Sequence, residues 1–210
     1  MSGRESVLSA VLEALRDVPG TESPHDAIPP ARRADHVGPD IVGLFAERAA
    51  EYRATVVRVP MGDTAAAVRR ALARTGARSV VVPPHLDEDL VPEGPWSLLK
   101  DVPPLTLGEL DAADAVITVV ASAIAVTGTV ILDHGPGQGR RVLTLLPDQH
   151  ICVVRASQIA PDVPEALRRL DPCRPLTLVS GPSATSDIEL DRVEGVHGPR
   201  VLDIIVMADV

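Results

Sequence analysis

The hydrophobic residues in the first quarter of the chain recur at the spacing of an α-helix. In the first such segment they fall three or four positions apart until a Pro-Gly pair at residues 19–20 ends the pattern: Val7, Leu8, Val11, Leu12 and Leu15. The second segment begins after Pro39 and repeats the spacing: Ile41, Leu44, Phe45, Ala49 and Tyr52. The pattern predicts a helical N-terminal extension, residues 1–54, packed on the main domain.

From residue 55 onward, short and nearly continuous apolar runs alternate with helical segments. The runs predict strands at 55–59, 79–82, 115–120, 123–132, 149–154, 176–179 and 201–207. Helices are predicted at 63–74, 107–112 and 162–170. Runs this rich in Val, Ile and Leu are typical of strands buried on both faces, and the alternation indicates a mostly parallel sheet. We therefore expect residues 55–210 to form a three-layer α/β/α domain.

The charge balance argues against nucleic acid as a partner. The chain carries 29 acidic and 20 basic residues, and the formal net charge of −9 opposes binding to phosphate backbones and anionic membranes. Aromatic residues make up 1% of the chain, so the rings that stack on bases are scarce. No apolar run is long enough to span a bilayer, and the polar N-terminal segment lacks a signal-peptide core. The sequence predicts a cytoplasmic protein with no membrane span.

Side chains that commonly hold metals and cofactors are sparse. Cys152 and Cys173 are the only cysteines, fewer than a structural zinc site or an iron–sulfur cluster requires. There is also no recognisable dinucleotide-binding loop, so we expect no cofactor and no metal to be bound by this chain alone. Lys100 is the only lysine, and a Schiff-base mechanism would depend entirely on it. The acidic run at 85–89 is interpreted as a solvated loop rather than a metal site.

Three polar loops are candidates for a binding site, because loops at the strand ends of a parallel sheet gather ligands. The first contains Thr127, Gly128 and Thr129, where a glycine between two hydroxyls lets the backbone approach a ligand closely. A bulge or turn that requires a glycine explains the same residues equally well.

The second loop, residues 133–141, is rich in glycine and ends in two arginines. Arg140 and Arg141 could together clamp a carboxylate or a phosphate. The loop has neither the lysine of a P-loop nor a following helix, so it matches no nucleotide-binding motif. After it, Leu145 and Leu146 are expected to be buried, where they would hold the arginine-bearing loop against the sheet, and His150 to lie at the start of a central strand.

The third loop, residues 180–189, combines hydroxyls, a glycine and carboxylates directly after a predicted strand. Its candidate ligand-binding residues are Ser180, Gly181, Ser183 and Thr185. Candidate catalytic residues there and just beyond are Asp187, Glu189 and His197. An ordinary helix cap or Asx turn uses the same residue types. We expect the loops that carry Thr127, Arg140 and Ser183 to converge at one sheet edge and to bind a small anionic metabolite.

Four stretches in series within residues 127–199 resemble the LUD domain family: TGTVIL, GRRVLTLLPDQHICVV, SGPSATSDIE and GVHGP. The resemblance implies an α/β fold like that of sugar-phosphate isomerases and CoA transferases. It also implies a role in the oxidation of L-lactate to pyruvate, alongside separate iron–sulfur redox partner proteins. The chain departs from the family pattern at Val126, where members commonly have a glutamate, and at Ala184, where many have an arginine.

Three functions are compatible with these features. The chain could be an accessory component of a lactate-oxidising system that binds a small anion or docks onto its redox partners. It could be a stand-alone enzyme of the CoA-transferase or isomerase kind that uses Asp187 or Glu189. It could also be a pure interaction subunit with a vestigial pocket, as Val126 suggests.

Overall fold

The computed structural model describes residues 3–16, 38–185, 193–194 and 198–208. The chain divides into two compact units, Met1–Pro30 and Ala31–Val210. In the first unit, helix α1 (Gly3–Ala14) forms where the hydrophobic spacing predicts it. No residue of α1 is buried, and Leu8 and Leu12 are 51% and 71% exposed.

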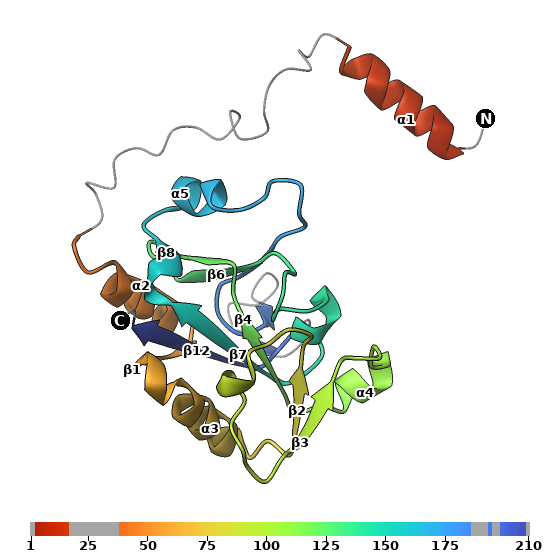
Figure 1. Ribbon diagram of the computed structural model, residues 1–210. Coiled ribbons are helices and arrows are strands. Elements are labelled where there is room, and N and C mark those ends of the chain that lie inside the picture. The colour runs from red at the N-terminus through yellow and green to blue at the C-terminus, as the bar shows by residue number, and fades with distance from the viewer. Residues whose placement is uncertain (1–2, 17–37, 186–192, 195–197, 209–210) are drawn as a thin grey trace. The chain divides into compact units, whose positions relative to one another are not determined.

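The second unit is built on a six-stranded sheet with the order β1-β12-β7-β4-β2-β3 (Figure 1). Its strands are β1 (Thr55–Pro60), β12 (Val201–Ala208), β7 (Gln149–Arg155), β4 (Ala115–Val119), β2 (Ser79–Val82) and β3 (Ser97–Lys100). Every pairing in this sheet is parallel. The prediction of an α/β fold with a mostly parallel sheet is confirmed. The strand β3 lies within a proline-rich stretch for which the hydrophobic pattern predicted no strand.

Helices cover the two faces of this sheet (Figure 1). Helix α3 (Thr64–Thr75) packs Val68 and Leu72 against one face, together with side chains such as Ile151 and Ile205. Helix α2 (Ile41–Glu51) packs on the opposite face, where it completely buries Phe45 among side chains such as Ile204. Adjacent residues of one strand thus enter different cores, because side chains alternate along a strand. The segment up to residue 54 therefore contributes α2 to a core of the sheet, and the predicted domain boundary itself stays a prediction.

Side-chain caps fix where three of the helices begin. Asp40 accepts a hydrogen bond from the Gly43 N–H at 2.7 Å at the start of α2, and Asp162 caps helix α5 (Val163–Arg168) in the same way. Helix α4 (Leu107–Asp111) begins with a capping box formed by Thr106 and Glu109.

A second, four-stranded sheet packs over the face that α2 covers, with the order β8-β5-β6-β9. Its strands are β8 (Ile159–Ala160), β5 (Ser122–Ile124), β6 (Thr129–Leu132) and β9 (Thr177–Val179). The prediction of one central strand at 123–132 is wrong, because β5 and β6 are an antiparallel hairpin of this second sheet. Both strands of the hairpin are fully buried, so the apolar residues on either side of the short turn at 125–128 predict a single strand.

Short elements complete the described chain. Single 3₁₀ turns are η2 (Met61–Asp63), η3 (Glu88–Leu90), η4 (Arg141–Thr144) and η5 (Ala156–Gln158). Strands β10 (Ala184–Thr185) and β11 (Val193–Glu194) pair antiparallel. Among the described residues, no helix has the length and apolar character needed to cross a membrane.

Candidate functional site

The first and third predicted loops meet in a cluster of hydroxyl groups. The Thr129 hydroxyl lies 2.7 Å from the Thr127 hydroxyl and 2.8 Å from that of Ser180. The contact forms because β6 begins at Thr129 and pairs antiparallel with β9, which ends one residue before Ser180. The expectation that these two loops converge is therefore met for Thr127 and Ser180.

The two glycines of these loops are required by packing against α2. Gly128 has φ +60°, and a Cβ atom there would lie 2.3 Å from the backbone nitrogen of Ala49. Gly181 has φ +87°, and its Cβ would lie 2.5 Å from the Tyr52 carbonyl oxygen. Any side chain would collide with backbone, so both positions accept only glycine. The backbone at these two glycines thus closely approaches helix α2 and its C-terminal end.

A cavity of about 350 Å³ brings Arg141 together with the third loop. We call it the Arg141 cavity; its polar lining includes Arg141, Thr144, Thr177, Ser180, Ser183 and His150. Arg141 is exposed and forms no ion pair with any residue that the structure describes. The cavity thus combines an available guanidinium with hydroxyls, which suits an anion.

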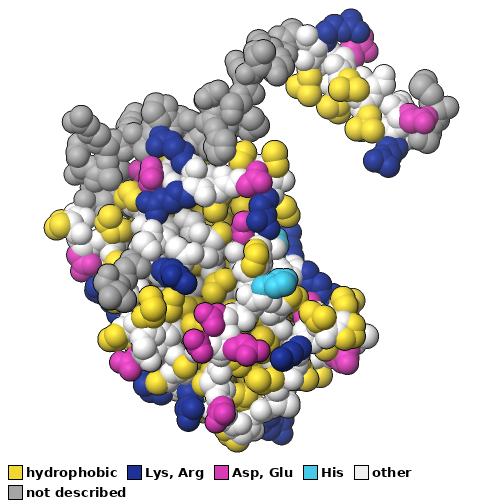
Figure 2. Space-filling model, viewed as in Figure 1, with side chains coloured by type: hydrophobic (Ala, Val, Ile, Leu, Met, Phe, Trp, Pro, Cys, Tyr) yellow, Lys and Arg dark blue, Asp and Glu magenta, His cyan; other side chains and the backbone are white. Residues whose placement is uncertain are grey.

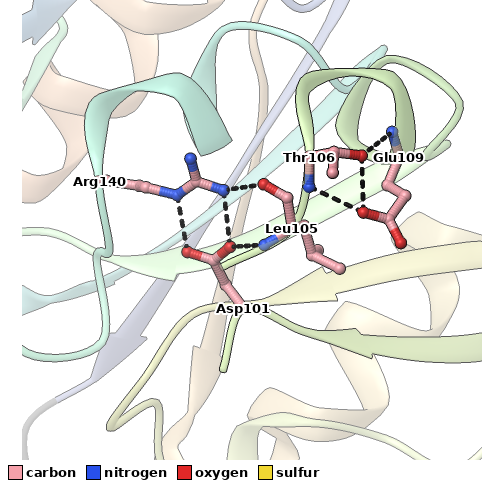
Figure 3. Close-up of polar contacts among 5 residues, drawn as sticks. All are labelled: Asp101, Leu105, Thr106, Glu109 and Arg140. Carbon is pink, nitrogen blue, oxygen red and sulfur yellow. Dashed lines mark hydrogen bonds and ion pairs between the residues drawn. The ribbon is translucent and has the colours of Figure 1, made fainter. Parts of the chain in front are cut away.

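Arg140 points to a different part of the molecule. Its Nε and Nη2 atoms donate to the two carboxylate oxygens of Asp101 at 3.0 and 2.8 Å, and Nη2 also donates to the Leu105 carbonyl (Figure 3). Burial acts to raise the pKa of Asp101, but hydrogen bonds from Arg140 and from the Leu105 N–H outweigh it, so this pKa lies below its ordinary value. Arg140 is thus committed to a structural clamp and does not line the Arg141 cavity.

The glycine-rich loop before Arg140 is held by its own hydrogen bonds. The Gln138 side chain accepts from the Asp133 N–H at 2.8 Å and donates to the Asp133 carboxylate at 2.7 Å. The Gly137 N–H donates to the Pro84 carbonyl at 3.0 Å, and the Gly137 carbonyl accepts from the Val119 N–H at 3.1 Å. This loop therefore supports the turn after β2, whereas the sequence predicted that its two arginines together clamp an anion.

His150 and Cys152 are buried neighbours on β7, and His150 lines the Arg141 cavity. The His150 Nε2 atom lies 2.8 Å from the Thr118 hydroxyl, and burial lowers the pKa of His150 to about 4. Burial likewise raises the pKa of Cys152 to about 12. At neutral pH both groups are therefore uncharged. The prediction that His150 begins a central strand is confirmed, since it is the second residue of β7.

The prediction that both leucines after the arginine loop are buried is wrong for Leu145. Its side chain is 37% exposed, whereas Leu146 is half-buried. The reason is the turn η4, after which Leu145 lines the open Arg141 cavity.

Two further cavities lie at the carboxyl ends of the sheet strands, where parallel sheets usually bind ligands. One, of about 510 Å³, is lined by Lys100 at the end of β3; the other, of about 570 Å³, is lined by Arg155 at the end of β7. His85, which follows β2 with φ +61°, lines both. Sequence reasoning did not select these residues as a binding site. His85 and Arg155 follow predicted strands, a signal that could have found them, whereas the strand that ends at Lys100 was not predicted.

Several predicted site residues cannot be placed in a cavity. Asp187, Glu189 and His197 lie outside the described residues, and Thr185 is described only as part of β10. Among the residues described, no group of three or more His, Cys, Asp or Glu side chains could hold a metal ion.

Comparison with known proteins assigns the family. Residues 107–207 match the LUD domain. Lactate utilization protein C of Deinococcus radiodurans is 48% identical over 172 residues, which cover 80% of each chain. The chain belongs to the LUD domain family.

Two other similar proteins align with more of the chain. Lactate utilization protein C of Halalkalibacterium halodurans is 29% identical over 232 aligned residues, 98% of each chain. The crystal structure of a DUF162 family protein from Deinococcus radiodurans matches with a TM-score of 0.70 and 41% identity, covering 85% of this chain and 99% of that one.

Val126, where the family resemblance led us to expect a glutamate, lines a fourth cavity of about 400 Å³. Glu51 of α2 lines the same cavity, so a carboxylate is present there despite Val126. This carboxylate is paired with Arg48 at 2.9 Å.

Proposed function

We propose that this LUD-domain protein is an accessory component of a lactate-utilisation system. In this role it binds a small anionic metabolite while separate iron–sulfur proteins carry the electrons released when L-lactate is oxidised to pyruvate. The name of the relative that is 48% identical supports the pathway. The cysteine content supports a role for separate iron–sulfur proteins, because two cysteines are too few to ligate an iron–sulfur cluster within this chain.

The binding role is supported mainly by the surroundings of Arg141. Arg141 is an exposed cation without an ion-pair partner among the described residues, and it lines a cavity together with the hydroxyls of Ser180 and Ser183. The volume of about 350 Å³ lies at the small end of the range for metabolite sites. Lactate and pyruvate are small enough for such a site, and each carries one carboxylate for the guanidinium.

Calorimetric titration with L-lactate, pyruvate and sulfate tests the binding role. Replacing Arg141 by Ala is expected to weaken anion binding by about 1.5–3 kcal/mol, because a charge-assisted hydrogen bond is lost. The matched control is Arg69→Ala, which removes an exposed arginine of α3 that lines none of the described cavities. Equal affinity in the wild type and in the Arg141 variant would remove Arg141 from the site. No anion binding in the wild type would leave the interaction-subunit hypothesis.

The accessory role is tested separately by reconstitution. Lactate oxidation is expected only when separate iron–sulfur partner proteins are added. Turnover of lactate by the purified chain alone would contradict the accessory role and favour a stand-alone enzyme.

A further inference from the structure

The cavity of about 510 Å³ at the carboxyl ends of β2 and β3, which we call the Lys100 cavity, differs in character from the Arg141 cavity. Its wall is mainly apolar and includes Val82, Leu86, Val91, Leu98 and Val102. Leu98 and Val102 are 45% and 67% exposed, so apolar surface is left open to solvent. Figure 2 shows hydrophobic side chains beside charged ones over the part of the molecule where Figure 1 places β2 and β3.

The charges around this cavity leave one cation available. Asp101 lines the cavity, but its carboxylate is held by two hydrogen bonds from Arg140. Lys100, the only lysine of the chain, also lines the cavity and forms no ion pair with any described residue. The remaining charged or titratable groups are Glu88 and His85, and Glu88 is not within ion-pair distance of Lys100.

The wall that carries Lys100 is fixed in place. The Asp101 N–H donates to the Val82 carbonyl at 3.2 Å, which continues the pairing of β3 with β2. Arg140 then ties Asp101 to the Leu105 carbonyl, on the segment that leads into α4 (Figure 3). On the other wall, Gly137 supports the turn that carries His85 by its hydrogen bond to Pro84. A cavity with fixed walls requires little reorganisation when a ligand binds.

We propose that the Lys100 cavity binds an amphipathic monocarboxylate, with the carboxylate on the Lys100 ammonium and a short hydrocarbon chain against the apolar wall. A largely apolar pocket with a few charged groups is the usual form of a small-molecule site. The ammonium selects an anion, and the apolar wall selects a hydrocarbon body over a small hydrophilic anion such as lactate. This site is separate from the Arg141 cavity, so the inference does not depend on the proposed function.

A chain-length series measures the apolar contribution. In calorimetric titrations of the full chain with acetate, butyrate and hexanoate at constant ionic strength, affinity is expected to rise roughly fourfold per added methylene, the value for burying one CH₂ group. Hexylamine, which has the same hydrocarbon chain and the opposite charge, is expected to bind at least tenfold more weakly than hexanoate. An affinity independent of chain length, or equal for hexanoate and hexylamine, would overturn the proposal.

Variants that each remove one charged side chain test whether Lys100 binds the carboxylate. Lys100→Met is expected to lower hexanoate affinity about tenfold, and Glu88→Gln to raise it about twofold, because a repelling carboxylate is removed. Arg69→Met is the control for general loss of positive charge, and Arg141→Ala excludes binding in the other cavity. Both controls should leave hexanoate affinity unchanged, and thermal unfolding checks that each variant is folded. Unchanged affinity in Lys100→Met would contradict the proposal.

The single lysine also allows a direct readout. Reductive methylation with ¹³C-formaldehyde keeps the charge of the amine and places one lysine signal in the NMR spectrum, which is identified by its loss in Lys100→Met. Hexanoate is expected to shift this signal with the same dissociation constant that calorimetry gives. A signal that stays in place at saturating hexanoate would show that the ligand binds elsewhere.

Discussion

Two neighbouring arginines, Arg140 and Arg141, have the same side chain but different surroundings. Arg140 is bonded to Asp101 and Leu105, whereas Arg141 is exposed in a cavity. The sequence indicates two guanidiniums at the end of a glycine-rich loop. It does not indicate which of them has a carboxylate partner, because Asp101 is 39 positions away. The same limit applies to Lys100, whose cavity is formed by residues of two stretches, 82–91 and 98–102.

The buried histidine gives a pH dependence whose sign follows from its pKa. The pKa of His150 is lowered to about 4 by burial, so between pH 6.5 and pH 4 only the unfolded chain takes up this proton. Stability is therefore expected to fall as pH falls through this window, by about 2–3 kcal/mol at pH 4.5.

Urea unfolding at pH 7 and pH 4.5 measures this loss. His150→Gln, which retains a hydrogen-bonding side chain toward Thr118, is expected to lose less stability than the wild type over the same interval. Equal losses in both proteins would mean that His150 accepts a proton in the folded state.

At the scale of elements, the strand–helix alternation predicts most of the main sheet correctly, including β7 and β12. The hairpin of β5 and β6 escaped prediction because both strands are fully buried and the turn between them contains a single glycine. The convergence of the loops at Thr127 and Ser180 could be expected from parallel-sheet geometry, but it arises from antiparallel pairing in the second sheet. The pattern along one chain does not distinguish these two causes.

Gly76 and Gly128 have similar positive φ angles but different surroundings. Substitutions at the two positions therefore distinguish the cost of backbone strain from the cost of a steric clash. Gly76 at the end of α3 has φ +70° with open space around its Cβ position, whereas Gly128 has φ +60° and contacts α2. Gly76→Ala is expected to cost about 1 kcal/mol, the strain of a left-handed conformation. Gly128→Ala should cost at least about 2 kcal/mol more, because the added methyl collides with the backbone of α2.

Chemical denaturation of both variants gives this difference directly. Equal destabilisation would mean that α2 moves away from the β5–β6 turn at little cost.

At the scale of the whole molecule, the described part of residues 31–210 has cores on both faces of one sheet. Helix α2 belongs to one of these cores through Phe45, which is completely buried. We therefore expect α2 to unfold together with the sheet in one cooperative transition.

Phe45→Ala tests this coupling. The substitution is expected to destabilise the protein by about 3–5 kcal/mol, the usual cost of removing a buried phenylalanine. Leu8→Ala, at a half-exposed position of α1, should change stability by less than about 0.5 kcal/mol. A small effect of Phe45→Ala, with α2 melting before the sheet in circular dichroism, would show that α2 is an independent attachment.

The strand order has a consequence for how the polypeptide is made. Strand β1 has β12 as its sheet neighbour, and the pairing joins Thr55 to Asp203. At a synthesis rate of 5–20 residues per second, the ribosome needs roughly 7–30 s to add the intervening residues. During that interval the nascent β1 lacks its neighbour, and β7 lacks one of its two. Completion of the sheet therefore waits until β12 has been synthesised, and until then its unpaired strands are accessible to cellular chaperones.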